Sequence, residues 1–202
     1  MNYELGDKMN LKEEFIKLGY TEDDYNEIRN SYPLINIKDE TISMHLKDIF
    51  TFFLECGYTK KEVIKITKIL PAIYGLSIEN MKQKIVDIMD LGYTKEEVIK
   101  MTKTLPAIYS LSIENIKQKI DFYNLIGMHE LAVIDAKNLM QSTNLSYARY
   151  SFYIDLGINI DMNNYRKLFI NQKQFEKTYG ITKEELLERY DYNKYKEEVE
   201  KK

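Results

Sequence analysis

The stretch that decides the fold is GYTKKEVIK at residues 57–65, which returns as GYTKEEVIK at residues 92–100. The sequence LPAIY follows each copy, at residues 70–74 and again at residues 105–109. Both pairs are 35 residues apart (57 to 92 and 70 to 105). A repeat of this length indicates that one small structural unit is used several times.

An earlier and more diverged copy extends the repeat towards the N-terminus, with LGYT at residues 18–21 and YPLI at residues 32–35. In all three copies the proline follows the glycine by 14 residues (19 to 33, 57 to 71, 92 to 106), so every proline of the chain falls at one phase. Later glycines, at positions 127, 157 and 180, begin shorter and irregular copies. We therefore expect three good repeats over residues 18–127 and a degenerate one over residues 128–160.

Each repeat is predicted to form two helices that are joined at the proline. Thr59 and Glu62 have the spacing of a capping box at the start of the first helix. Pro71 ends that helix, because proline disfavours helical geometry in the residue before it. Ser77 is a good N-cap for the second helix, and apolar residues recur at three- to four-residue spacing through both helices. One helix pair cannot cover its own apolar stripes, so the units are expected to stack.

The composition favours the same fold class. With 8 Gly and 3 Pro in 202 residues, the chain has few of the turn residues that a β-sandwich or barrel needs, while 44% hydrophobic residues can form a core. We predict an all-α protein, a short α-solenoid that forms a single domain over residues 1–202. Residues 1–17 would form an N-terminal cap helix, and the tyrosine-rich residues 161–202 would cap the other end.

Several classes of chemistry lack their residues. Cys56 is the only cysteine, so an intramolecular disulfide is excluded, and we expect it to be a small buried side chain. His45 and His129 lie far apart in the sequence, and no nucleophile motif or glycine-rich phosphate loop is present. We expect neither a cofactor, nor a metal, nor enzymatic activity. Without a targeting sequence at the N-terminus or an apolar run of membrane-spanning length, the expected location is the cytoplasm.

The repeat also resembles a known family. A unit of about 35 residues that runs from apolar-Gly-aromatic-Thr through a capped helix and Leu-Pro to SIENIKQKI, at residues 112–120, is similar to the mitochondrial transcription termination factor (mTERF) family. The resemblance implies an all-α superhelix with a short third turn after each proline. It also implies non-catalytic binding of double-stranded DNA or structured RNA through basic residues along the array, and a role in transcription. The missing organelle presequence points to a bacterial, phage or plasmid setting.

The charge of the chain is unevenly distributed, although its net value is -3. Residues 1–56 hold 6 basic and 12 acidic residues, residues 57–128 hold 11 and 8, and residues 129–202 hold 12 and 12. The two best repeats are therefore the only basic part of the chain. An array of cations at a regular separation is what a phosphate backbone requires.

Lysines recur at equivalent positions of these two repeats and are the candidate nucleic-acid-binding residues. The first helices supply Lys65, Lys68, Lys100 and Lys103, and the second helices supply the supporting residues Lys82, Lys84, Lys117 and Lys119. At the phase of Lys65 and Lys68 the first repeat has Glu27 and Asn30, and the fourth is aligned with Asp135 and Asn138. We expect that reversing the four first-helix lysines to glutamate removes binding without lowering the melting temperature. The simpler interpretation is that these lysines form only the solvated face of surface helices.

The second function that the sequence supports is a protein-interaction scaffold, for example a phage or plasmid inhibitor of a host protein. Its basis is the acidic N-terminal region together with tyrosines on the C-terminal side, such as Tyr147, Tyr150 and Tyr153. Base stacking is a possible role for the repeat tyrosines. Packing between successive units is the favoured one, because Tyr20, Tyr58 and Tyr93 recur regardless of the local charge.

Overall fold

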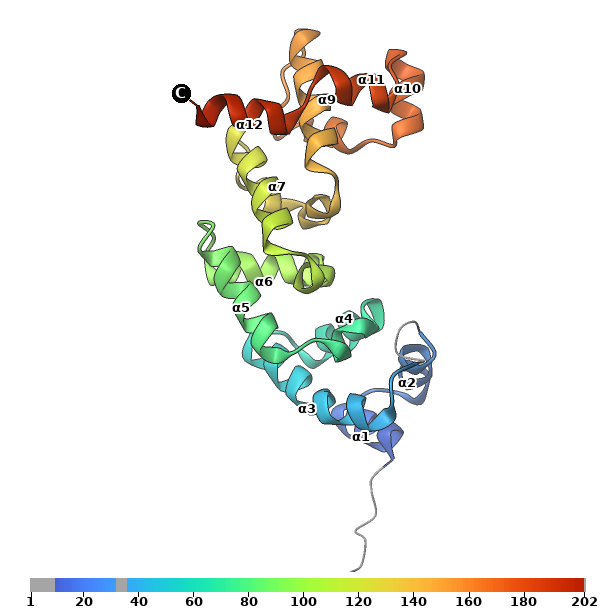
Figure 1. Ribbon diagram of the computed structural model, residues 1–202. Coiled ribbons are helices and arrows are strands. Elements are labelled where there is room, and N and C mark those ends of the chain that lie inside the picture. The colour runs from blue at the N-terminus through green and yellow to red at the C-terminus, as the bar shows by residue number, and fades with distance from the viewer. Residues whose placement is uncertain (1–9, 32–35, 202) are drawn as a thin grey trace, which may run out of the picture. The chain divides into compact units, whose positions relative to one another are not determined.

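A computed structural model describes residues 10–31 and 36–201 of the chain, and within these ranges every regular element is a helix (Figure 1). The predicted all-α class is thereby confirmed. The expected connector at Pro33 and the first nine residues of the expected N-terminal cap lie outside the described residues. No helix in the described ranges is both long and apolar enough to cross a membrane.

The chain divides into two compact units, which are described separately. Unit 1 is Met1–Leu111 and unit 2 is Ser112–Lys202. The elements of unit 1 are α1 (Leu11–Leu18), α2 (Glu22–Arg29), α3 (Asp39–Glu55), α4 (Lys60–Ile69), η2 (Pro71–Gly75), α5 (Ile78–Met89), α6 (Lys95–Thr104) and η3 (Pro106–Ser110). Those of unit 2 are α7 (Ile113–Leu125), α8 (Leu131–Ile134), η4 (Ala136–Met140), α9 (Thr143–Asp155), η5 (Tyr165–Phe169), α10 (Gln172–Tyr179), α11 (Lys183–Arg189) and α12 (Tyr192–Glu200).

The predicted signals of the repeat set these boundaries. Thr59 caps α4 by accepting a hydrogen bond from the backbone amide of Glu62, and the Glu62 carboxylate accepts one from the amide of Thr59. Thr94 and Glu97 form the same capping box at the start of α6. Gly57 precedes α4 with φ 84°, in the left-handed region that favours glycine. The proline ends the first helix and then opens a 3₁₀-helix, η2 or η3, which is the short third turn that the resemblance implies.

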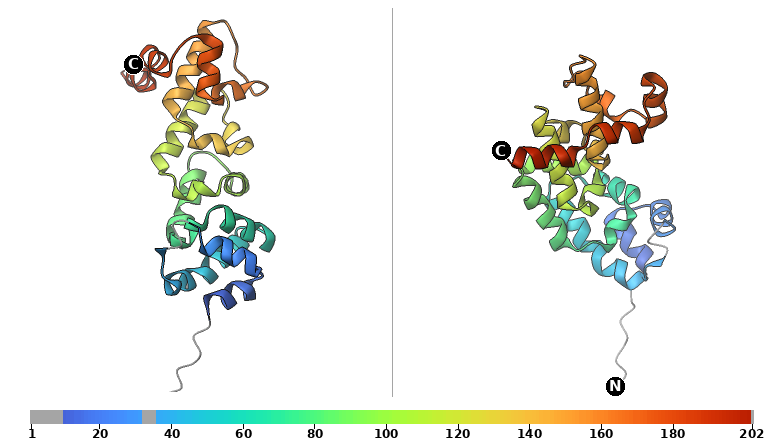
Figure 2. Two further views of the ribbon diagram at one scale, coloured as in Figure 1. Left: turned by 90° about the vertical axis from the view of Figure 1, so that its right-hand side faces the viewer. Right: turned by 45° about the horizontal axis from the view of Figure 1, so that its top comes forward.

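Within unit 1 the helices stack in the order of the repeats (Figures 1 and 2). The second helices α1, α3 and α5 pack one on the next, and the first helix α2 packs on α4. Buried tyrosines join the repeats: the Tyr20 hydroxyl lies 3.0 Å from Thr67 Oγ1 and 2.9 Å from the Tyr74 hydroxyl. One repeat later, Tyr58 forms the equivalent bond with Thr102. The packing role expected for Tyr20 and Tyr58 is confirmed.

Unit 2 departs from the expected repeat. Its first helix, α8, has only four residues, so the 3₁₀-helix η4 starts at Ala136, 9 residues after Gly127 rather than 14. The alignment of Asp135 with Lys100 is therefore wrong: Asp135 stands immediately before η4, where Leu105 stands before η3. The missing residues lie in the first helix, which shifts everything after it by five positions.

Tyrosines fill the core of unit 2. Tyr147 and Tyr150 lie against Phe122, and Tyr192 of α12 covers the same ring. Tyr153 is fully buried and packs against rings of α10, those of Phe175 and Tyr179. Of the three tyrosines that the sequence places on one face of α9, Tyr147 and Tyr150 therefore share the Phe122 ring, whereas Tyr153 packs against α10.

Candidate nucleic-acid interface

Lys68 does not present a free ammonium group. It lies near the end of α4, and its Nζ forms ion pairs with two carboxylates of α2, Asp24 at 2.7 Å and Glu27 at 2.8 Å. These acids hold the pKa of the Lys68 ammonium above its usual value. Lys68 therefore joins the first helices of two successive repeats.

Lys103 makes the equivalent connection from α6 to α4. Its Nζ lies 3.2 Å from Glu62 Oε1 and 5.0 Å from the centre of the Tyr58 ring. It also donates a 3.5 Å hydrogen bond to the carbonyl oxygen of Gly57. Both lysines thus reach back to the start of the preceding first helix, a role that the sequence alone did not reveal.

The acids in these pairs each serve two repeats. Asp24 Oδ2 accepts a 3.0 Å hydrogen bond from the Thr21 amide and so caps its own helix, while Oδ1 binds Lys68 of the next repeat. Glu62 divides its oxygens in the same way between Thr59 and Lys103. A reversal at Lys68 or Lys103 would place a carboxylate against these acids. The expectation that reversing all four first-helix lysines leaves the melting temperature unchanged is corrected for that reason.

Asp24 gives this connection a measurable acid dependence. The Lys68 ammonium, followed by the hydrogen bonds from Thr21, lowers the pKa of Asp24 to about 2 from its usual 3.8. A depressed carboxyl pKa contributes stability that is present above the unfolded value and is lost as the pH falls through the folded value. We expect the melting temperature of the wild type to fall between about pH 4 and pH 2 by a few degrees more than that of Asp24→Asn. The control is Asp23→Asn, at an exposed residue of α2, and its melting temperature should fall with pH as steeply as that of the wild type. If the melting temperatures of Asp24→Asn and the wild type decrease equally in acid, the pairing of Asp24 with Lys68 is contradicted.

The second-helix lysines divide by exposure. The Lys84 ammonium is half-buried and donates a 2.7 Å hydrogen bond to the carbonyl oxygen of Leu111, at the end of η3. Lys119 is fully buried, with a relative exposure of 0%. The prediction of Lys119 as a surface cation is therefore wrong, because its ammonium group lies inside unit 2. Burial lowers the pKa of Lys119 to about 7.

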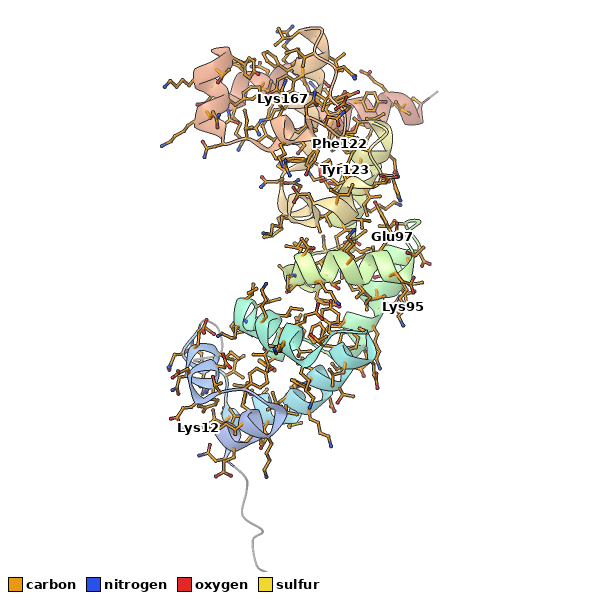
Figure 3. All side chains as sticks on the ribbon, turned by 180° about the vertical axis from the view of Figure 1, so that it is seen from behind. Lys12, Lys95, Glu97, Phe122, Tyr123 and Lys167 are labelled. Carbon is orange, nitrogen blue, oxygen red and sulfur yellow. The ribbon has the colours of Figure 1, made fainter. Side chains whose placement is uncertain are left out.

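The other four candidates are exposed. Lys65 and Lys100 lie at equivalent positions of α4 and α6 in unit 1, Lys82 lies on α5, and Lys117 lies on α7 of unit 2. None of their ammonium groups has an ion-pair or hydrogen-bond partner within residues 10–31 and 36–201. Lys95 begins α6, where it is drawn with Glu97 in Figure 3, and it is exposed as well.

Charge at the Lys65 phase changes along unit 1. In α2 this phase holds Glu27, which helps to neutralise Lys68. In α4 and α6 the same position holds Lys65 and Lys100. Lys103 of α6 therefore pairs with one acid of α4, Glu62, whereas Lys68 of α4 pairs with two acids of α2. Neither Lys65 nor Lys100 is paired with a carboxylate among the described residues.

The surroundings of Lys82 differ. It borders a depression between α3 and α5, which is also lined by His45, Lys47, Asp48 and Glu79. Because both signs of charge meet there, the depression is less suited to a phosphate than the step from α4 to α6.

No group of three or more metal-ligating side chains occurs in the part of the chain that the structure describes. Cys56, which the sequence places in the core, is half-buried, and burial raises its pKa. His129 Nδ1 lies 2.6 Å from the Asn124 amide oxygen. Cys56 belongs to unit 1 and His129 to unit 2.

Comparison with known proteins agrees with this geometry. No curated protein is similar enough to match the chain. The family model described as mTERF matches residues 1–130, which is more than half of the 202 residues. The match covers unit 1 with its two lysine connections and ends one residue before α8, where the regular spacing of the repeat is lost. The mTERF family is known for nucleic-acid binding and transcription termination. The chain, with its stacked helix-proline-helix repeats, belongs to the mTERF family.

Proposed function

We propose that this protein binds double-stranded DNA or structured RNA without catalysis and regulates transcription in the cytoplasm of a bacterial or phage system. Within unit 1, Lys65 and Lys100 bind phosphates and Lys82 supports them; Lys117 is a separate supporting contact on unit 2. The observation that carries the proposal is the pair of unpaired, exposed ammonium groups at equivalent positions of α4 and α6. The ion pair between Lys103 and Glu62 joins α6 to α4, so the two lysines lie on connected helices and are proposed to contact phosphates of one backbone.

The remaining candidates have a different role in this proposal. Lys68 and Lys103 hold successive first helices together, and Lys84 holds α5 to the connector of the next repeat. Family membership supports nucleic acid as the ligand class.

Fluorescence anisotropy of a labelled DNA duplex and a labelled RNA hairpin tests the function. Each neutralised phosphate contributes about 0.9 to the slope of log K against log salt concentration. Two to four lysine contacts should therefore give a slope between about -2 and -4 over 50–200 mM salt. The absence of binding to either probe at the lowest salt concentration would refute the proposal.

A protein scaffold is the second candidate, and one surface of unit 1 favours it. Met44 is 73% exposed and lies in a depression with the acids Glu14, Asp39 and Glu40. An apolar side chain ringed by carboxylates suits a basic protein partner. A stoichiometric partner that stays bound in high salt during purification, combined with no affinity for nucleic acid, would favour this candidate.

A further inference from the structure

Lys119 is a buried cation that the proposed function does not use. Its Nζ lies 3.1 Å from Ser146 Oγ of α9, which is its only hydrogen-bond partner in the described part of the chain. The rings of Phe122 and Phe169 lie with their centres 6.0 Å from the same nitrogen. Three elements, α7, α9 and η5, therefore enclose one ammonium group without supplying a carboxylate.

Equivalent cations of the neighbouring repeats are held differently. Lys84 and Arg149 occupy the same position of α5 and α9, seven residues after the N-cap serines Ser77 and Ser142. Lys84 donates to the carbonyl oxygen at the end of η3. Arg149 donates to the carbonyl oxygens of Leu168 and Ile170 and to the Gln172 side chain. Lys119, seven residues after Ser112, alone has no carbonyl acceptor among the described residues.

The titratable groups around Lys119 are engaged elsewhere. From α9, Arg149 binds the three acceptors named above, and Tyr147 and Tyr150 lie against Phe122. From η5, the Tyr165 hydroxyl donates to Asp135, immediately before η4, and Lys167 lies over the Tyr153 ring. Of the flanking charged groups, Lys137 on η4, Arg166 on η5 and Lys117 on α7 are exposed, and Asp121 on α7 is half-buried.

A charge in this position is costly. Removing an ammonium group from water disfavours its charged form unless a carboxylate or several acceptors replace the lost hydration. A single serine hydroxyl and two phenyl faces replace only part of it. Burial is the cause that brings the pKa of Lys119 down from 10.5 to about 7.

We propose that Lys119 is a proton-operated latch of unit 2. The neutral amine stays between Phe122 and Phe169 with its hydrogen bond to Ser146. Uptake of a proton drives the side chain towards water, and the packing of α7, α9 and η5 around it loosens. The inference is independent of nucleic-acid binding, because Lys119 is not exposed to a ligand.

The direction of the pH effect follows from linkage. The folded state releases the proton near pH 7 and the unfolded state near pH 10.5, so unfolding takes up a proton between these values and stability rises with pH. Between about pH 6 and about pH 8.5, the unfolding equilibrium constant of unit 2 should fall on the order of 30-fold through this group. Below the folded value both states are protonated and the effect levels off.

Two measurements on the full chain test the latch. The first is carbon NMR of the lysine side chains in the wild type, assigned through Lys119→Arg, in which the Lys119 signal should titrate near pH 7. The second is amide hydrogen exchange of α7 and α9 at about pH 6 and about pH 8.5, corrected for the pH dependence of intrinsic exchange. Protection should rise with pH in the wild type, and Lys119→Met should give high protection at both values.

Lys84→Met is the matched control, because it removes the equivalent lysine of unit 1, whose hydrogen bond to Leu111 it abolishes. It should lower stability and leave the pH dependence of α7 and α9 as in the wild type. The latch would be overturned if the NMR signal showed Lys119 still protonated at about pH 9. It would also be overturned if the protection of the α7 and α9 amides in the wild type did not change with pH. Because the NMR titration is made on the wild type, it still tests the latch if Lys119→Met fails to fold.

Discussion

Replacing Lys68 and Lys103 together by glutamate is expected to lower the melting temperature by about 5 °C. The double reversal removes the ion pairs to Asp24, Glu27 and Glu62. It also creates a cluster of like charges at each of the two steps between first helices. A single surface ion pair contributes little, but here both steps of one stacked unit lose a connection and gain a repulsion.

Lys68→Met combined with Lys103→Met separates the two effects, since methionine keeps the apolar stem and adds no charge. This variant should fall between the wild type and the double glutamate variant. Raising the salt concentration should narrow the gap between the glutamate variant and the wild type, because salt screens the added repulsion. A glutamate variant that melts with the wild type at low salt would show that the connections do not hold the repeats together.

The second large effect is expected at Lys65 and Lys100. Reversing both to glutamate should weaken binding to the duplex or hairpin by about 10- to 100-fold at 100 mM salt and reduce the salt slope by about 2, which is one phosphate contact for each lysine. The melting temperature should stay within about 1 °C of the wild type, because neither ammonium group has a partner in the described part of the chain.

Lys173→Glu with Lys177→Glu is the matched control, because both residues are exposed on α10 of unit 2 and the change in net charge is identical. This control should bind nearly as the wild type does. Equal losses in the two double variants would mean that net charge, and not the position of Lys65 and Lys100, governs the affinity.

Local signals made most of the fold predictable. The capping box at Thr59 and Glu62, the N-cap at Ser77 and the break before Pro71 each depend on neighbouring residues, so they were readable from the sequence. The short α8 was not predictable, because its copy has no proline to mark where the first helix ends.

The candidate site was only partly predictable, because it depends on contacts between residues that are far apart in the sequence. Lys65 and Lys68 look alike in the sequence, three residues apart on one helix. Only the stacking of α2 on α4 brings Asp24, 44 residues away, to Lys68. Lys84 and Lys119 likewise share one phase and one local sequence, yet the first is half-buried and the second is enclosed. Which repeat lysines are available to a ligand depends on contacts across the repeats.

The most direct test of this division of roles measures two quantities on the same two proteins, the double glutamate variant at Lys65 and Lys100 and the one at Lys68 and Lys103. Melting temperature and affinity for a labelled duplex or hairpin are determined for each at low salt. The variant at Lys65 and Lys100 should bind more weakly and keep the wild-type melting temperature, whereas the variant at Lys68 and Lys103 should melt at a lower temperature. Two variants that melt alike and bind alike would contradict the account.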